Sequence, residues 1–115
     1  MAIKKVELHV HLEGTIPPKL AQQLAKRNQL TLPPHLINKE ETGYNYPDFM
    51  GFLKAYDDVA AVIKQPRDYY DLTYDYLRSS AASDGIYVEM MYSPDHAEQM
   101  SGIPSGEHLQ AIQQA

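Results

Sequence analysis

The chain has 115 residues, of which 43% are hydrophobic and 22% are charged, the composition of an ordinary globular domain. Its 10 basic and 15 acidic residues give a net charge of −5, which argues against binding to a nucleic-acid backbone. Because there is no cysteine, disulfides and thiolate metal ligands are excluded.

The start of the chain and its apolar stretches bear on localisation. Residues 1–6 lack the long apolar run of a signal peptide. No segment approaches the roughly 20 apolar residues that are needed to span a bilayer. We therefore expect a soluble, cytoplasmic protein with neither a membrane nor a nucleic acid as partner.

Local patterns predict the elements in the order strand, helices, strand, helix. Residues 4–10 alternate as a strand, with His9 and His11 expected on the same side as Glu7. Apolar residues with helical spacing, together with proline and glycine at the ends, predict helices over residues 17–28, 48–64, 66–81 and from about 105 onward. Gly85 is expected to end the third helix in a left-handed conformation, before a nearly continuous apolar strand over residues 86–92.

This order of elements predicts an α/β fold. Two strands that are joined by a helical crossover form a parallel pair. Such a pair cannot bury both faces and both edges alone, so it belongs to a larger sheet or barrel, and a complete eight-stranded barrel needs roughly 250 residues. We therefore interpret the chain as a piece of a larger domain.

The most informative segment is H-V-H-L-E-G at residues 9–14. Histidines at i and i+2 of a strand project from one face, so His9 and His11 can reach the same ion. Imidazole suits zinc and its first-row neighbours. A histidine pair of this kind also occurs simply as part of a solvated surface, and the motif alone leaves that alternative open.

Three segments together resemble the adenosine deaminase family of metal-dependent amidohydrolases. H-V-H-L-E-G is similar to the first-strand signature of the family, and G-F-L-K-A-Y at residues 51–56 is similar to its purine-covering helix. G-I-Y-V-E-M-M-Y-S-P at residues 85–94 resembles its second strand. The resemblance spans nearly the whole chain and keeps the order of the segments.

The resemblance implies that residues 1–115 are the N-terminal part of a single deaminase domain, truncated from a (β/α)8 TIM barrel. It implies one zinc ion per full-length chain, held in part by His9 and His11. The implied substrate-binding residues are His11, Glu13, Phe52, Leu53 and Tyr56. The other zinc ligands and the acid–base residues would lie on later strands, so we expect no catalytic residue within this chain and no activity from it alone.

The implied reaction is zinc-dependent hydrolytic deamination of a 6-aminopurine, with adenosine to inosine plus ammonia as the first expectation. Glu13 stands where adenosine deaminases usually have aspartate, and H-L-E-G is frequent among adenine deaminases, so adenine or another purine is the alternative. Hydrolysis of a cyclic amide or ester, and a non-enzymatic truncated chain, are further alternatives. The partner would be a small purine base or nucleoside, and the isolated chain is expected to self-associate.

Several residues also have a purely structural interpretation. The apolar residues Phe52, Leu53 and Tyr56 would serve equally as the core-facing side of a helix. Glu89, between apolar neighbours in the second strand, is expected to be a buried polar anchor inside the barrel, and His96 is expected to lie in a loop. His35 and His108 have no context in the sequence that indicates a role.

Overall fold

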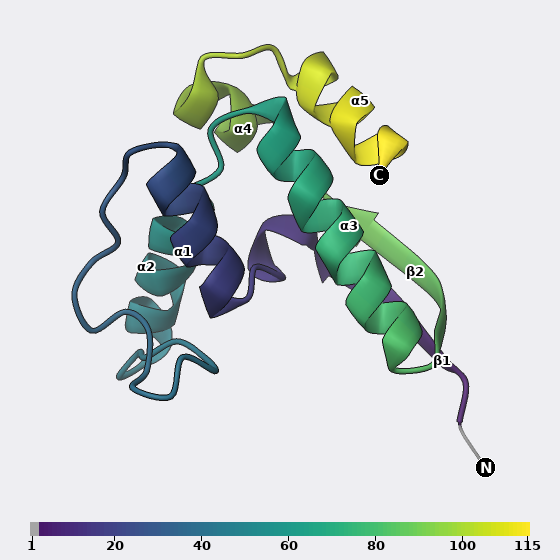
Figure 1. Ribbon diagram of the computed structural model, residues 1–115, viewed down its shortest axis with the longest axis horizontal. Coiled ribbons are helices and arrows are strands. Elements are labelled where there is room, and N and C mark those ends of the chain that lie inside the picture. Colours follow the sequence, from purple (N-terminus) through teal and green to yellow (C-terminus); the bar gives the residue numbers. More distant parts are fainter. Residues whose placement is uncertain (1–2) are drawn as a thin grey trace.

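The computed structural model describes residues 3–115 (Figure 1). Strand β1 is followed by the 3-10 turn η1, the helices α1 to α3, strand β2 and the helices α4 and α5. Their bounds are β1 Lys5–His11, η1 Leu12–Gly14, α1 Pro18–Arg27, α2 Phe49–Ala60, α3 Pro66–Ala82, β2 Gly85–Met91, α4 Pro94–Ser101 and α5 Ser105–Gln114. Within these described residues, no helix has the length and apolar character that crossing a membrane requires.

The two strands form a parallel pair, as predicted from the order of elements. Helix α3 packs against β2, and α5 packs along α3 (Figure 1). The pairing is irregular between Glu7 and Val10. At this irregularity His9 has a φ of 61°, so the strict alternation that we expected for β1 is interrupted there. Since the strands are parallel, the segments that follow β1 and β2 leave from the same end of the sheet.

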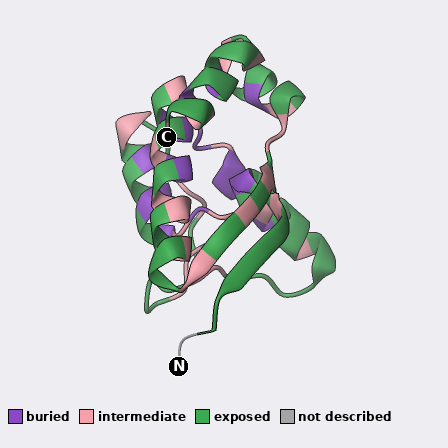
Figure 2. Ribbon diagram, turned by 90° about the vertical axis from the view of Figure 1, so that its right-hand side faces the viewer, coloured by how far each residue is buried: buried purple, intermediate pink, exposed green. Residues whose placement is uncertain are grey.

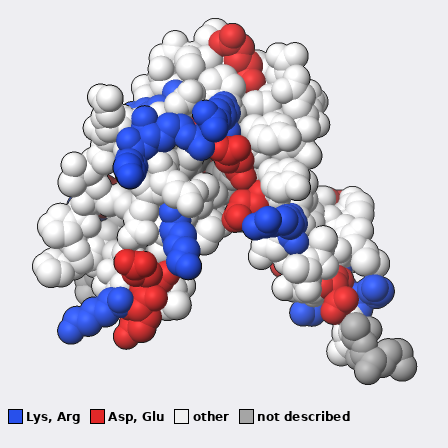
Figure 3. Space-filling view, viewed as in Figure 1, with Lys and Arg blue, Asp and Glu red and all other residues white. Residues whose placement is uncertain are grey.

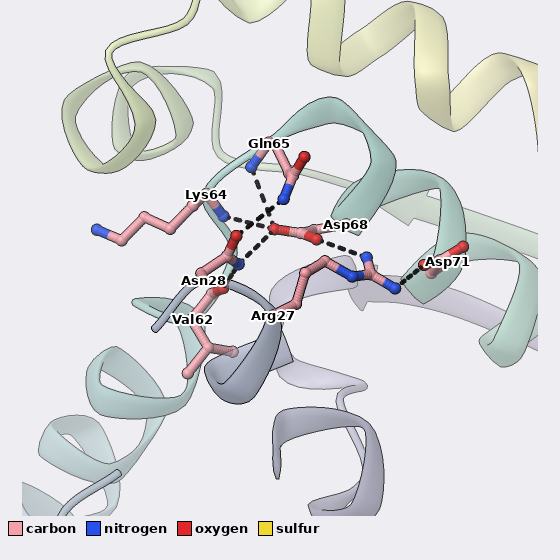
Figure 4. Close-up of polar contacts among 7 residues, drawn as sticks. All are labelled: Arg27, Asn28, Val62, Lys64, Gln65, Asp68 and Asp71. Carbon is pink, nitrogen blue, oxygen red and sulfur yellow. Dashed lines mark hydrogen bonds and ion pairs between the residues drawn. The ribbon is translucent and has the colours of Figure 1, made fainter. Parts of the chain in front are cut away.

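The start of α3 carries several side-chain hydrogen bonds. Pro66 occupies its first turn, and Gln65 and Asp68 form a reciprocal capping box. The fully buried Asp68 also accepts hydrogen bonds from Arg27 and Asn28 at the end of α1, both at 2.8 Å (Figure 4). This network ties the end of α1 to the beginning of α3 and satisfies a carboxylate that would be costly to bury alone.

The hydrophobic core lies among the helices and the turn after β1, and not on the sheet. Its fully buried members include Leu12 of η1, Leu24 of α1 and Leu72 of α3. Both strands are mostly exposed, as the green ribbons in Figure 2 show. Leu8 is 60% exposed and Ile86 is 65% exposed. Apolar parallel strands of this kind are normally covered on both faces by other parts of a protein.

Three predictions about local structure were wrong. Residues 94–101 form helix α4, begun by Pro94 and ended by Gly102 with a φ of 72°, so His96 is helical and not in a loop. Helix α2 ends at Ala60 rather than at residue 64. Glu89 is exposed within the described residues and accepts a hydrogen bond of 2.7 Å from Tyr87. Its expected burial concerns the interior of a complete barrel and stays a prediction.

The left-handed residue after α3 is Asp84, with a φ of 68°, and not Gly85. Gly85 is needed for a different reason, because a Cβ at this position would lie 2.8 Å from the carbonyl oxygen of Ser80. The glycine therefore allows β2 to begin directly against the last turn of α3.

Candidate functional site

The two histidines predicted as metal ligands lie at the end of β1. Their ring centroids are 5.1 Å apart, and the ring planes meet at 67°. Both side chains are exposed. The irregular pairing and the left-handed backbone at His9 mean that simple strand alternation does not account for this arrangement, yet the rings lie next to each other as a shared ion requires.

The donor set at this end of the sheet is incomplete for a catalytic zinc ion. Catalytic zinc sites use three protein ligands and keep one position open. Within residues 3–115, no group of three or more histidine, cysteine or acidic side chains could hold a metal. Two adjacent imidazoles are compatible with part of such a site, and among the described residues no third ligand joins them.

Glu13 lies immediately beyond the histidines, in η1, and is only 2% exposed. Its Oε1 accepts a hydrogen bond of 3.0 Å from the hydroxyl of Tyr69 on α3 and one of 2.7 Å from the backbone N–H of Ser93 after β2. Its Oε2 is buried and has no hydrogen-bond partner among the described residues. The carboxylate thus links the segments that follow both strands and keeps one oxygen free.

A cavity of about 150 Å³ lies beside Glu13, between η1 and α2. Three of the predicted substrate-binding residues, Glu13, Phe52 and Tyr56, line it. Leu53 is not among its lining residues and is 41% exposed. His11 is not in this wall either and lies at the neighbouring end of β1.

The cavity wall also contains Tyr44 and Tyr46, which the sequence did not single out. They lie in the long irregular connection between α1 and α2, where no periodicity assigns a direction to a side chain. In the sequence, only the presence of tyrosines in this connection could have indicated a contribution to the cavity. The Tyr44 hydroxyl donates a hydrogen bond of 2.6 Å to the carbonyl oxygen of Ile16, which closes the connection over the cavity.

Two phenols of the cavity wall, those of Tyr44 and Tyr56, are held in their neutral form. Burial raises the pKa of Tyr44 well above its ordinary value. Burial, reinforced by the negative charges of Glu13 and Asp57, raises the pKa of Tyr56 to about 12. Among the lining residues that the structure describes, Glu13 is the one with a formal charge. An aromatic cavity with a single carboxylate suits a flat ring that carries N–H or O–H donors.

Charges elsewhere on the described surface are mixed. On the face shown in Figure 3, basic side chains lie beside acidic ones. Arg27 pairs with Asp68 at 2.8 Å and with Asp71 at 2.7 Å, and Lys54 pairs with Asp58 at 2.8 Å. The opposite charges within these pairs neutralise each other, and the carboxylate of Glu13 in the cavity belongs to none of them.

The sequence matches the family model described as adenosine deaminase over residues 4–115. The chain is 38% identical over 115 residues to an adenine deaminase of Bordetella avium, and the match covers 99% of this chain and 36% of the relative. The chain therefore spans about a third of the length of this curated relative.

Two solved structures support the same relationship. The crystal structure of an adenine deaminase from Arthrobacter aurescens is 30% identical with a TM-score of 0.79, over 96% of this chain and 33% of that one. An amidohydrolase from Burkholderia ambifaria with bound zinc is 27% identical with a TM-score of 0.71, over 96% of this chain and 30% of that one. The two parallel strands and their helices are thus a portion of a (β/α)8 barrel, and the chain belongs to the adenosine deaminase family.

Proposed function

We propose that this chain forms part of a zinc-dependent enzyme that hydrolytically deaminates a 6-aminopurine. The observation that carries the proposal is the placement of His9, His11 and Glu13 at one end of the sheet, with an aromatic cavity beside them. Membership of a deaminase family supports the reaction class. Because the chain spans about a third of its relatives, the activity is proposed for the whole protein that contains it.

Within that site we propose that His9 and His11 supply two ligands to one zinc ion. Zinc, when bound, supplies Lewis-acid activation of the attacking water. The support is the contact between the two exposed rings and the bound zinc of the Burkholderia ambifaria relative. The third protein ligand and the proton-transferring residues would come from parts of the barrel outside this chain.

The remaining residues would bind and orient the purine. Phe52 and Tyr56 present aromatic surface that excludes water from the reacting centre and strengthens the electrostatic interactions there. Glu13 offers a carboxylate oxygen to a donor on the substrate. Leu53 lies outside this cavity wall, so its contact with the purine stays a prediction from the sequence.

We propose adenine ahead of adenosine as the substrate, which reverses the order expected from the sequence. The Bordetella avium relative and the Arthrobacter aurescens structure are both described as adenine deaminases. Comparing kcat/KM for adenine and for adenosine in the whole protein tests this choice. A higher kcat/KM for adenosine would contradict it and restore the first expectation.

The metal assignment is tested with His9→Asn and His11→Ala in the whole protein. Asparagine is chosen at position 9 because it tolerates the left-handed backbone found there. Both variants should lose zinc, measured by elemental analysis, and more than about 100-fold in kcat/KM, since losing a direct ligand should cost more than losing a group behind one. His96→Ala, on α4, is the matched control and should keep both. Full zinc occupancy in both variants would show that the metal lies elsewhere.

A further inference from the structure

The asymmetry of the Glu13 carboxylate is the starting point. Both hydrogen bonds to this buried group, from the Tyr69 hydroxyl and the Ser93 N–H, go to Oε1. Oε2 is equally buried and has none among the described residues. A buried carboxylate oxygen without a donor is costly. The side chain also lines the cavity, so a donor on a bound ligand would complete its bonding.

The Tyr69 side chain is buried and closely surrounded by other side chains. It is 1% exposed, and its ring packs edge to face against Tyr92 with centroids 5.9 Å apart. The His108 ring of α5 lies at 5.0 Å from it, so Glu13, Tyr92 and His108 together surround the phenol. Burial, together with the charge of Glu13, raises the Tyr69 pKa well above its ordinary value. The hydroxyl therefore remains a donor, with Glu13 as its acceptor.

We propose that Tyr69 is a positioning residue that holds Glu13 with Oε2 free to accept a hydrogen bond from an N–H or O–H of the purine substrate. This inference rests on the proposed function. Tyr69 lies 56 residues from Glu13 in the sequence, and it is not itself one of the residues that line the cavity. Its effect on the substrate therefore passes entirely through the carboxylate.

A carboxylate oxygen accepts hydrogen bonds, so the affinity of a ligand should depend on the orientation of Glu13 only if the ligand carries a donor beside it. Adenine carries an N–H on its imidazole ring, and adenosine carries ribose hydroxyls on that side. In 9-methyladenine that nitrogen is methylated, and no donor remains on that side of the ring. A correctly held Glu13 should favour the first two ligands, and loss of its orientation should reduce this preference while leaving the aromatic contacts unchanged.

The first test is Tyr69→Phe in the whole protein, which removes only the hydroxyl. We expect about a tenfold rise in KM for adenine and a change in kcat of less than about twofold, because a binding contact is lost and the chemistry is not. The inhibition constant of 9-methyladenine should change less than about twofold. Tyr92→Phe is the matched control, since the Tyr92 hydroxyl bonds the carbonyl oxygen of Ser105 and not Glu13.

A purely structural Tyr69 gives a different result. In that case both Tyr→Phe variants lower the melting temperature, and neither changes the ratio of adenine to 9-methyladenine affinity. That outcome would overturn the inference while leaving the proposed function in place. A wild-type protein that deaminates no 6-aminopurine would overturn the proposed function and this inference with it.

A second variant covers the case in which Tyr69→Phe does not fold. In Glu13→Gln the amide oxygen has to take the place of Oε1 to accept both bonds, which puts the NH2 group where Oε2 was. A donor would then face the donor of adenine, so adenine affinity should fall about tenfold or more relative to that of 9-methyladenine. Unchanged relative affinity in this variant would overturn the inference.

Discussion

His108 is fully buried between α3 and α5, and its hydrogen bond defines its tautomer. The hydroxyl of Ser101 donates to the carbonyl oxygen of Ala97 at 2.6 Å, so it can only accept from Nε2–H of His108 at 2.8 Å. Nδ1 is buried and has no partner among the described residues. The arrangement suits a neutral imidazole, because a second N–H would have no acceptor.

The pH dependence of stability follows from this burial. Burial lowers the pKa of His108, while the nearby Glu107, Asp68 and Glu98 partly oppose the shift. The unfolded chain then binds the proton more readily, so stability is complete above about pH 6.5 and is lost as the pH falls through that value, by at most about 1.4 kcal/mol per pH unit.

The measurement is the difference in melting temperature between the wild-type protein and His108→Phe as the pH is lowered from 7.5 to 5.5. The phenyl ring keeps the packing against Tyr69 but cannot titrate. The wild type should lose stability relative to the variant over this range. Parallel curves for the two proteins would contradict a buried neutral histidine.

These residues also show what a single sequence can and cannot reveal. His9 and His11 were singled out from the sequence because their i, i+2 spacing within one motif is a local signal. The roles of His108 and Tyr69 depend on partners 7 and 56 residues away, which no local pattern contains. Tyr44 was missed for a related reason, since it reaches the cavity from an irregular connection.

At the scale of the elements, the junction between α3 and β2 requires a residue without a side chain at position 85. Gly85→Ala would place a methyl group 2.8 Å from the backbone of Ser80, and should destabilise the protein by about 1–3 kcal/mol. Gly106→Ala is the control, because a Cβ at this position in α5 meets nothing within 4 Å. It should be neutral or stabilising by up to about 1 kcal/mol. Melting temperatures that rank the two variants in the opposite order would show that the junction is not this tight.

The element order was predictable because proline, glycine and apolar spacing mark most of the boundaries. Pro66 and the capping box at the start of α3 are both legible in the sequence. Helix α4 was missed because its eight residues have only one buried position, Ala97, and so show no apolar periodicity. The irregular pairing at His9 was missed because a histidine also fits a regular strand. Nothing in the neighbouring sequence indicates a left-handed residue there.

At the scale of the whole molecule, the strand pair presents exposed apolar side chains and two unpaired outer edges. Val6 is 57% exposed and Ile86 is 65% exposed. The same surface is expected to be covered by other strands and helices in a complete barrel. The parallel fold and the family were therefore predictable from the sequence, while the interior of the barrel depends on residues that this chain does not contain.

We expect the isolated 115-residue chain to self-associate through these strands. Light scattering should detect oligomers, and strand amides should exchange quickly in any monomer. The double variant Val6→Lys and Ile86→Lys should shift the chain toward monomer, because charge on an exposed strand opposes pairing. A sharp monomer peak for the unmodified chain, with strand amides protected for hours, would mean that the strand pair is stable without a cover.

The two hydrogen bonds to Glu13 can form during translation only after the residues that donate them have been synthesised. The carboxylate leaves the ribosome long before Ser93, which follows it 80 residues later in the sequence. At roughly 5–20 residues per second, synthesis takes about 4–16 s to bridge that interval. Until then Glu13 has at most the Tyr69 hydroxyl as a donor from the folded chain, so the turn after β1 cannot complete its bonding before the second strand has been made. The hydrogen bond from Ser93 to Glu13 thus forms only after the second strand has been synthesised.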